Sequence, residues 1–491
     1  MATVKFARAQ LLRRPNFRDW YLPLVLVVAA AIVVRILLMT GYPSAIYAAN
    51  DELRFARIPG YPHHATLFGD SWVPAGYPAF LLTARAITNW LPFTIFLQHV
   101  IGIATGLLVY ALMRRASAPR WLALLPAAVV LFDSDQLWTE HVLLSEVLFT
   151  FFVTAGLYAA VRAWQQDASR VWLVASGVLL ALSGLTRNVG VILPVVVAIW
   201  SLFVTRGGWR ARATSAGLVV LPAAAVVVLY LVTVSLANGE SGLTEMGGWN
   251  LYGRVGQFAD CQKFTPPKGT ERFCEGTPPG RRGGPFFYVW DPGSPARQVT
   301  GQVVEAANAG PPGRFARAAI IAQPLDYARA VTKDMVRFVD PTVGTDRANA
   351  GEEVLAFDFS RGSPYIQSFV PQLRQKYTGV GERTTLVSLF ESYQHVFVPG
   401  SLGITLLILL SLAGLVFGRG PARSVAALLG ATAFLLCLAS VATWSYDVRY
   451  AVPPLGALAG CAALGGLAIT QRVAEARAAR GEEAWWPATA R

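Results

Sequence analysis

The stretch "WYLPLVLVVAAAIVVRILLM", residues 20–39, decides the class of this protein. It is an almost unbroken apolar run, and an α-helix needs about 20 such residues to cross the hydrocarbon core of a bilayer. Of the 491 residues, 54% are hydrophobic and 14% are charged, whereas soluble domains carry about 25% charged residues. One hydrophobic core cannot bury so much apolar surface. The sequence therefore predicts a protein that crosses the membrane many times.

More apolar runs of similar length follow the first one. We predict about ten spanning helices, at roughly 21–40, 91–113, 121–133, 143–163, 171–186, 189–205, 215–237, 397–417, 424–441 and 451–470. The runs at 121–133 and 171–186 are short for a full crossing. The expected fold class is an all-α polytopic membrane protein.

The orientation follows from the rule that cytoplasmic loops carry the excess of Lys and Arg. A cytoplasmic N-terminus gives six cytoplasmic pieces, and each contains Lys or Arg: "LLRRPNFR", "MRRASAPR", "RAWQQDASR", "TRGGWRARA", "FGRGPARS" and "QRVAEARAAR". We therefore expect both termini in the cytoplasm and the connections 41–90 and 238–396 outside. The formal charge of +13 then belongs to membrane topology, and no nucleic-acid partner is expected.

The connection 238–396 is too long for a structureless loop. It begins rich in Gly and Pro ("TPPKGTERFCEGTPPGRRGGPFF") and continues with helix-like patterns. We predict a small, mainly helical extracytoplasmic domain here. The chain then divides into a transmembrane module at 1–237 with its first outer loop at 41–90, the outer domain at 238–396, C-terminal helices at 397–470 and a cytoplasmic tail at 471–491.

The four cysteines fall into two kinds of environment. Cys261 and Cys274 lie in the outer domain, where an oxidising compartment favours a disulfide between them. Cys437 and Cys461 lie within apolar runs and are interpreted as packing residues. The sequence contains no CxxC and no Cys/His zinc spacing.

Ionisable residues gather beside the spans on the outer side. Ionisable groups near the hydrocarbon are costly and usually mark function. They occur as Asp51 and Glu52 in "DELRF", as the acids of "FDSDQLWTEHVLLSE", as Arg187 in "GLTRNVG", and as Asp447, Arg449 and Tyr450 in "WSYDVRYAVP". Carboxylates and arginines at one interface suit an anionic lipid head group and a general base. Asp133 and Asp135 are interpreted as solvated loop acids.

Several of these motifs stand in an order that resembles a known enzyme family. They are "DELRF", "PAGYPAFL", "LQHVIGIATGLLVYALMRR", "LLSEVLFTFF", "GLTRNVG", "EMGGWNLYGR" and "DVRYAVPPLG". The chain resembles the GT-C superfamily of membrane glycosyltransferases, within it family 39, the group of protein O-mannosyltransferases, aminoarabinose transferases and their RgtA/B/C/D-like bacterial relatives. The resemblance covers about residues 20–255 and 397–470, and it does not cover the outer domain.

The resemblance implies transfer of a sugar from a polyprenyl-phosphate carrier to an acceptor at the outer face, usually with inversion. Asp51 would be the general base that takes the acceptor's proton, and Glu52 would orient the acceptor or bind a metal. Arg187 and Arg449 would hold the lipid phosphate and stabilise it as it leaves. Contacts to phosphate or sugar would also come from Arg54, Tyr77, Glu146, Asn250, Tyr252 and Tyr450.

Structural roles stay open for each of these side chains. The acidic pair has the alternative of an ordinary loop charge pair. Glu146 has the alternative of capping the helix that begins near Ser145, or of holding a basic partner. Arg187 has the alternative of a residue at the membrane interface whose guanidinium extends into water. Arg449 has the alternative of a structural ion pair with Asp447.

Two other functions also stay open. A transporter or flippase of lipid-linked sugars would carry polar residues in mid-helix and broken helices at related positions, whereas the apolar runs here are nearly free of charge. A polymerase or ligase of the O-antigen type would use arginines and a histidine in the large outer loop. Arg281, Arg282 and His395 are available for that role.

The expected partners are a polyprenyl-phosphate-linked sugar donor, membrane lipid, and a protein, lipid or cell-envelope glycan as acceptor. No metal site is assigned and a divalent cation stays open, because His63 and His64 lack a third, spaced ligand. Arg far outnumbers Lys and Ala, Gly and Val are abundant, which is typical of a GC-rich bacterial genome. The expected location is the bacterial inner membrane, with the site facing outward.

Overall fold

The computed structural model describes residues 17–46, 55, 67–68, 72–239, 242–244, 246–300, 310–340, 370–380 and 385–480. Within these ranges the chain is helical, with short 3₁₀ turns and no β-strand beyond isolated bridges. Lipid offers no hydrogen-bond partner to the backbone, so an apolar segment must satisfy its own peptide groups as a helix. The expected all-α fold is confirmed.

Ten apolar helices of the described part correspond to the ten expected spans. They are α2 (Phe17–Gly41), α5 (Leu91–Arg115), α6 (Arg120–Phe132), α8 (Glu146–Gln165), α9 (Arg170–Thr186), α10 (Leu193–Val204), α11 (Trp209–Asn238), α21 (Gly400–Phe417), α22 (Gly420–Thr443) and α23 (Val452–Ala479). Seven are long and apolar enough to cross a membrane, whereas α6, α9 and α10 are shorter. The protein is a multi-pass membrane protein.

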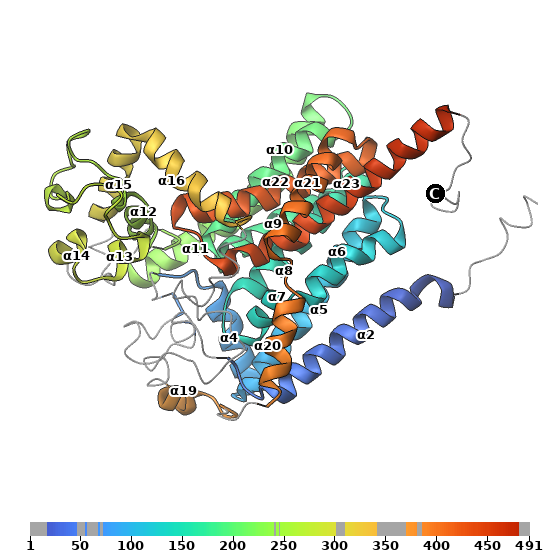
Figure 1. Cartoon of the computed structure of the whole chain (residues 1–491), viewed down its shortest axis with the longest axis horizontal. Coiled ribbons are helices and arrows are strands. Elements are labelled where there is room, and N and C mark those ends of the chain that lie inside the picture. The colour runs from blue at the N-terminus through green and yellow to red at the C-terminus, as the bar shows by residue number, and fades with distance from the viewer. Residues whose placement is uncertain are drawn as a thin grey trace, which may run out of the picture.

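The spanning helices run side by side, and α2 begins on the same side of the bundle as α23 ends (Figure 1). Short connections at 116–119, 166–169, 205–208 and 418–419 make sequential helices antiparallel neighbours. Arginines flank these connections, so this side is called the basic end. At the opposite side, the site end, α6 and α9 finish while α8 and α23 begin.

Shorter helices lie at the site end. They are α4 (Gly76–Ile87), α7 (Ser134–His141), η1 (Asn188–Ile192), α12 (Met246–Gly256), η2 (Glu271–Phe273), α13 (Pro285–Trp290), α14 (Pro295–Thr300), α15 (Gly310–Ala322), α16 (Pro324–Arg337), α19 (Val370–Lys376), α20 (Val387–Val396) and η6 (Val448–Ala451). Figure 1 shows α12 to α16 grouped beyond the ends of the membrane helices. Residues 246–300 and 310–340 are called the loop domain.

The loop domain has an aromatic core of its own. Trp249, Tyr252, Phe273, Tyr288 and Phe315 are buried in one cluster, and their rings meet mainly edge to face, the arrangement that aromatic quadrupoles favour. Large aromatic side chains compensate for the short helices, because each buries much apolar area.

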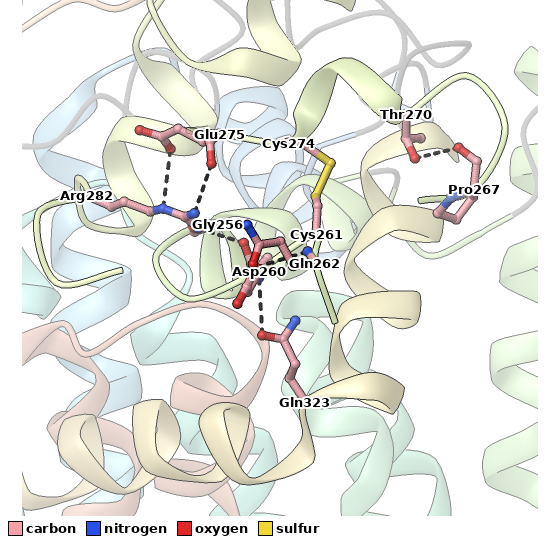
Figure 2. Close-up of a disulfide and its surroundings, with 11 residues drawn as sticks. Gly256, Asp260, Cys261, Gln262, Pro267, Thr270, Cys274, Glu275, Arg282 and Gln323 are labelled. Carbon is pink, nitrogen blue, oxygen red and sulfur yellow. Dashed lines mark hydrogen bonds and ion pairs between the residues drawn. A yellow bond between two sulfur atoms is a disulfide. The ribbon is translucent and has the colours of Figure 1, made fainter. Parts of the chain in front are cut away.

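A disulfide closes the Gly- and Pro-rich part of the loop domain. Cys261 and Cys274 are joined, with Cα atoms 5.9 Å apart. Beside them, the Arg282 guanidinium donates to four backbone carbonyls, including those of Gly256 and Ala259 (Figure 2). Arg282 therefore replaces the missing secondary structure as a hydrogen-bond partner for this irregular backbone.

One buried arginine ties the loop domain to the membrane helices. Arg254 of α12 donates from Nη2 to Oδ2 of Asp334 on α16 at 2.6 Å, and from Nε to the carbonyl of Val441 on α22 at 2.7 Å. Oδ2 of Asp334 also accepts the backbone N–H of Tyr446 at 3.2 Å. This contact fixes the loop domain beside the turn that leads into α23.

The later part of the large connection leaves the loop domain and packs on the membrane helices. The backbone of Thr378, just after α19, pairs with Asn89 and Leu91 at 2.9 Å each. On α20, the Tyr393 hydroxyl donates to the carbonyl of Phe132 at 2.6 Å. The stretch expected as one outer domain, 238–396, thus contains two separately packed parts.

Small residues allow α21 and α23 to touch backbone to backbone. A Cβ added to Gly465 would lie 1.7 Å from the carbonyl oxygen of Leu410, and one added to Gly414 would lie 3.0 Å from the Cα of Gly465. Close approach through small residues is a general way for helices to associate in membranes.

We expect Gly465→Ala to lower the stability of the detergent-solubilised protein by about 1–3 kcal/mol, because the added methyl group must force two backbones apart. The measurement is the midpoint of thermal unfolding. Gly466→Ala, where nothing lies within 4 Å of the added Cβ, is the control and should leave the midpoint unchanged or slightly higher. Equal shifts for the two variants would contradict this account of the packing.

Candidate functional site

Three helix ends bring one carboxylate and two arginines together. Glu146 is the first residue of α8 and its side chain is 1% exposed. Its Oε1 forms an ion pair with Nη1 of Arg187, the residue that follows α9. Nε of Arg449, in η6, lies 3.8 Å from the same oxygen. The structure therefore joins three residues that the sequence analysis had singled out separately.

Two more side chains complete this group. Oδ2 of Asp447 lies 2.9 Å from Nε of Arg449, and Oδ1 caps η6 by accepting the backbone N–H of Arg449 at 3.1 Å. The guanidinium carbons of Arg187 and Arg449 lie 5.2 and 5.7 Å from the centre of the Tyr450 ring, within the range of cation–π attraction. Glu146, Arg187, Asp447, Arg449 and Tyr450 are called the arginine cluster.

The arginine cluster is partly open to solvent. The side chains of Arg187 and Arg449 are 19% and 16% exposed, whereas that of Glu146 is buried. Glu146 thus contacts the two guanidinium groups from the buried side. A guanidinium has more N–H donors than one carboxylate contact uses, and its planar fork matches phosphate oxygens. Chemically, the cluster suits an anion that approaches from the exposed side.

The local sequence explains why these charges stand at helix ends. In "GLTRNVG", Arg187 has extended backbone after α9, and η1 begins directly behind it. In "SYDVRYAVPP", the Asp447 cap starts a 3₁₀ turn, and a Pro pair at 453–454 follows in the first turn of α23, where proline is tolerated because its missing N–H has no partner there. Arg187, Asp447 and Arg449 are thereby kept out of the apolar spans.

A cleft lies next to the arginine cluster. It holds about 580 Å³ of empty space, open solvent included, between α7, α16, α21 and the start of α23. Val448 and Ala451, on either side of Arg449 and Tyr450, line it together with Phe338, Ile404, Val452 and Leu455. Its wall is mainly apolar, and Arg337, Asp340 and two acids of α7 add charge.

Those two acids, Asp133 and Asp135, correct one interpretation from sequence. They are 4% and 6% exposed, so they are not solvated loop acids. Asp133 caps α7 by accepting the N–H of Gln136 at 2.7 Å, and α7 itself is buried along its length. The polar stretch "DSDQLWTEH" is a buried helix, and the charged or ring groups of Glu140 and His141 within it find partners on other elements.

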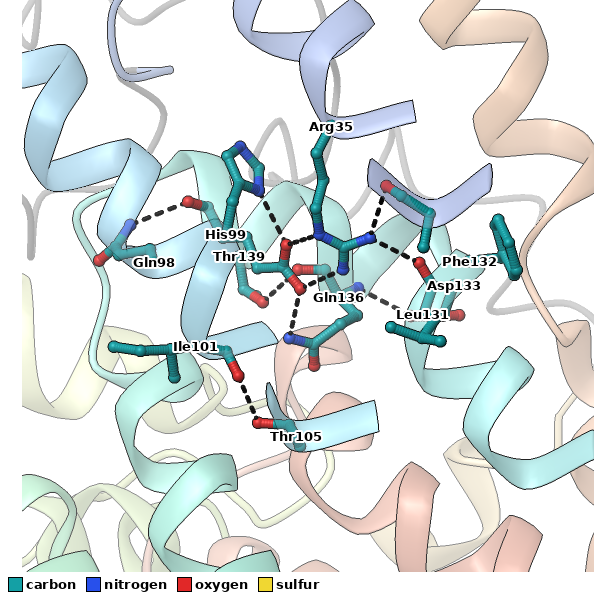
Figure 3. A network of polar contacts seen from close by, with 12 residues as sticks. Arg35, Gln98, His99, Ile101, Thr105, Leu131, Phe132, Asp133, Gln136 and Thr139 are labelled. Carbon is teal, nitrogen blue, oxygen red and sulfur yellow. Dashed lines mark hydrogen bonds and ion pairs between the residues drawn. The ribbon is translucent and has the colours of Figure 1, made fainter. Parts of the chain in front are cut away.

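A second polar network is buried at the site end (Figure 3). Nη2 and Nε of Arg35 on α2 donate to the two carboxylate oxygens of Glu140 on α7 at 2.7 and 2.8 Å. Nδ1 of His99 on α5 lies 2.8 Å from Oε2 of the same carboxylate. This network connects α2, α5 and α7.

Sequence analysis did not single out Arg35 or His99. Both lie within apolar runs, and an ionisable residue inside such a run is itself a signal of function or of a buried partner. The partner of each was not readable, because Glu140 is far away in sequence.

The remaining expected site residues have different fates. Asp51, Glu52 and Arg54 lie outside the described residues. Tyr77 is buried, and its hydroxyl donates to Oε1 of Gln98 at 2.6 Å. Asn250 is half-buried on α12. Tyr252 is enclosed in the aromatic core of the loop domain, where burial raises the pKa of its phenol well above the usual value. Their proposed contacts to sugar or phosphate stay predictions.

The ends of the segment that carries the acidic pair are described. The N–H of Ile46 donates to the carbonyl of His141 at 3.0 Å, and the ring of Phe55 lies 4.8 Å from that of Tyr77. Ile46 and Phe55 share one buried cluster with Val448, the neighbour of Arg449. The chain therefore enters and leaves 47–54 at the hydrophobic cluster that supports η6.

No group of three or more His, Cys, Asp or Glu side chains that could hold a metal ion occurs in the part of the chain that the structure describes. His63 and His64 lie outside that part. The ligands of a divalent cation, left open by the sequence, are therefore not assigned.

Fold and site define a polytopic helical membrane protein with paired arginines and carboxylates at one membrane face. Residues 65–238 match the family model of dolichyl-phosphate-mannose-protein mannosyltransferase. The match contains Glu146 and Arg187 and excludes both Asp51 and Arg449. Over these residues the expected similarity to GT-C mannosyltransferases is confirmed. A search of curated proteins found no match.

Solved structures of GT-C enzymes are similar at low identity. The archaeal oligosaccharyltransferase AglB from Archaeoglobus fulgidus, in complex with an inhibitory peptide and a dolichol-phosphate, is 13% identical, with a TM-score of 0.46 over 95% of this chain and 52% of that chain. ArnT from Cupriavidus metallidurans bound to undecaprenyl phosphate is 16% identical, with a TM-score of 0.35 over 95% and 80%. The S. cerevisiae protein O-mannosyltransferase Pmt1-Pmt2 complex bound to the sugar donor is 17% identical, with a TM-score of 0.37 over 51% and 38%. The chain spans about half of the archaeal enzyme.

We expect Glu146→Gln to destabilise the protein by about 1–3 kcal/mol, because two partly buried guanidinium groups lose their shared counter-charge. Thermal unfolding in detergent measures this. The control is Glu475→Gln at the basic end, where Glu475 forms a largely exposed pair with Arg419 at 2.8 Å and the loss should be about 0.5 kcal/mol or less. A larger shift in the control than in Glu146→Gln would show that the cluster does not support the fold.

Proposed function

We propose that this protein is a glycosyltransferase that moves a sugar from a polyprenyl-phosphate carrier to an acceptor, with Asp51 as general base and with inversion at the anomeric carbon. The acceptor oxygen forms a bond to the anomeric carbon while the bond from that carbon to the phosphate oxygen breaks. The acceptor proton passes to the Asp51 carboxylate, and the electron pair leaves with the polyprenyl phosphate.

The observation that carries this proposal is the arginine cluster. A phosphodiester donor has one negative charge, and the phosphate monoester that leaves approaches two at neutral pH. Arg187 and Arg449, held from beneath by Glu146, would meet that developing charge. Groups that bind the transition state more strongly than the ground state are the ones that accelerate a reaction.

The apolar cleft supports a lipid-linked donor. Val448, Val452, Leu455 and Ile404 give it a wall that suits a prenyl chain, and the arginine cluster adjoins it through η6. A donor with an anionic head and an apolar tail fits this combination of surfaces better than a free sugar nucleotide, which has no lipid tail.

The position of the described anchors supports Asp51 as the base. Asp51 is four residues from Phe55, so their Cα atoms are within about 14 Å of each other. Phe55 and Val448 belong to one buried cluster. A carboxylate on this short tether has the reach to meet an acceptor at the arginine cluster, as a general base must. We assign Glu52 the role of orienting the acceptor.

The topology supports an outward-facing site in a bacterial inner membrane. Arginines flank the short connections of the basic end, which is the pattern of cytoplasmic loops. The arginine cluster and the disulfide-bonded loop domain belong to the opposite end, and disulfides persist in oxidising compartments. The acceptor would then be a protein, lipid or glycan of the cell envelope.

The experiment that tests the function is a transfer assay in membranes that lack the native protein. These membranes receive wild type or Asp51→Asn and a panel of radiolabelled polyprenyl-phosphate sugars. We expect label to reach an acceptor with wild type, and kcat to fall roughly 1,000-fold with Asp51→Asn, within the range reported for loss of a general base together with correct acceptor orientation. Glu52→Gln should lose less. Equal transfer by Asp51→Asn at equal expression would exclude Asp51 as the base.

The arginines make a separate prediction. We expect Arg187→Lys to lower kcat about tenfold and to raise the donor KM less, because the lost bidentate contact matters most when phosphate charge develops. Arg419→Lys at the basic end, where the arginine is exposed, is the matched control and should leave both constants unchanged. If Arg187→Lys raised KM alone, the guanidinium would contribute to ground-state binding only.

A further inference from the structure

The proposed function leaves a fully buried ionisable network unused. Arg35, His99, Glu140 and His141 are each at most 3% exposed. Four ionisable side chains away from water are costly unless each is paired, and they lie outside the arginine cluster. Their contacts form one chain that starts at Arg35 on α2 and passes through Glu140 and His99 (Figure 3).

The chain ends on the backbone that leads into the acidic pair. Nε2 of His99 lies 3.0 Å from Nδ1 of His141, and Nε2 of His141 lies 2.9 Å from the carbonyl oxygen of Tyr42. The carbonyl of His141 accepts the N–H of Ile46 at 3.0 Å. His141 thus holds residues 42–46 at both of their ends, by its ring and by its backbone.

The surrounding packing keeps this chain in place. Nε2 of Gln98 donates to the carbonyls of Glu140 and Val142 at 2.9 and 2.8 Å. A Cβ added to Gly102 would lie only 1.9 Å from Oε1 of Glu140, so α5 approaches the carboxylate closely because glycine stands there. The close packing of α5 against α7 therefore holds the network in place.

A count of protons shows that the two histidines hold one more than two neutral rings supply. The carbonyl of Tyr42 can only accept, so Nε2 of His141 must donate. The Glu140 carboxylate accepts from Arg35, so Nδ1 of His99 must donate to it. The contact between Nε2 of His99 and Nδ1 of His141 then needs a third proton. Without it, two lone pairs would face each other.

The electrostatics identify the ring that carries the extra proton. Burial alone would raise the pKa of Glu140, but the Arg35 guanidinium and the hydrogen bond from His99 outweigh it and hold that pKa below its usual value. Burial, with the charge of His99 beside it, lowers the pKa of His141 to about 3. The carboxylate is therefore ionised and His141 is a weak base, so the hydrogen-bond count assigns the extra proton to His99, which lies between them.

Other titratable groups on the packed elements complete the charge environment. They are Tyr42 just after α2, Tyr77 on α4, Asp133 and Asp135 beside and on α7, Glu146 on α8 and Tyr393 on α20. Among the described residues, His141 is the one histidine whose ring contacts His99.

We propose that His99 and His141 are positioning residues: together with Glu140 they share one excess proton and clamp residues 42–46, which fixes the point from which the segment with Asp51 departs. The catalytic part of this inference rests on the proposed function. It adds that the position of Asp51, the proposed base, depends on the protonation of His99. The clamp is complete when His99 is protonated. As pH rises and the proton leaves, one hydrogen bond is lost and the hold on Tyr42 weakens.

Hydrogen exchange tests the clamp without reference to catalysis. The readout is the protection factor of the peptide that contains Ile46, corrected for the intrinsic effect of pH, in the full-length protein between about pH 4.5 and pH 8.5, which extends well to both sides of the ordinary histidine pKa of about 6.5. In wild type we expect protection to fall about tenfold or more as pH rises. His99→Leu should be poorly protected at every pH.

His99→Gln is the conservative variant that separates positioning from bulk packing. The Gln amide N–H can donate to Nδ1 of neutral His141, which leaves Nε2–H for the Tyr42 carbonyl, so no excess proton is needed. We expect protection of Ile46 near the wild-type value and without pH dependence. Gly102→Ala, which displaces the Glu140 carboxylate, should resemble His99→Leu, and Gly466→Ala is the neutral control.

Transfer kinetics then connect the clamp to the base. We expect His99→Leu to lower kcat roughly 10-fold to 100-fold, as a small misplacement of a catalytic group does, with a donor KM within about threefold of wild type. His99→Gln should recover most of kcat and lose the alkaline decline. If wild-type protection at Ile46 does not change with pH, or if His99→Leu keeps it, the proposal is overturned. If the protection of Ile46 changes as expected but no form of the protein, wild type included, transfers a sugar, the clamp is supported and the proposed function is rejected.

Discussion

The burial of charge at a membrane surface is the constraint on which the site end depends. An ionised group withdrawn from water costs several kcal/mol unless a partner meets it. Glu146, 1% exposed, is met by Arg187 and by Arg449. The start of α8, the end of α9 and the turn before α23 must therefore come together. The same contact turns two arginines toward the solvent side, where an anion can reach them. Stability and the proposed anion binding thus come from one set of side chains.

The first spanning helix shows the same constraint from the opposite direction. Only 17% of the α2 span is buried, so apolar packing attaches it weakly to the bundle. Arg35 supplies the attachment, because its guanidinium binds the Glu140 carboxylate and the carbonyl of Leu131. An arginine within an apolar helix would be costly alone; here it joins α2 to α6 and α7. The end of α2, from which residues 42–46 depart, is thereby fixed to the site end of the bundle.

The loop domain is coupled to the same region by a buried arginine. Arg254 binds Asp334 and the end of α22 at once, and Asp334 also holds the backbone at Tyr446, one residue before Asp447. A movement of the loop domain would reach the arginine cluster through this turn. The cleft between α16, α21 and α23 lies along this junction. Any molecule that binds the loop domain would therefore act on the turn that carries Arg449.

The sequence by itself determined the class, the ten apolar helices and the end at which charges gather, because hydropathy and the cost of charge in lipid act locally along the chain. It also selected Glu146, Arg187, Arg449 and Tyr450 as site candidates from their place beside the spans. Only the tertiary structure decided which of these side chains pair with each other. Glu140 lies far in sequence from Arg35 and His99, and the burial of the "DSDQLWTEH" helix brings Glu140 and His141 to partners on other elements. Such pairings depend on helix packing across the bundle, and no local pattern records them.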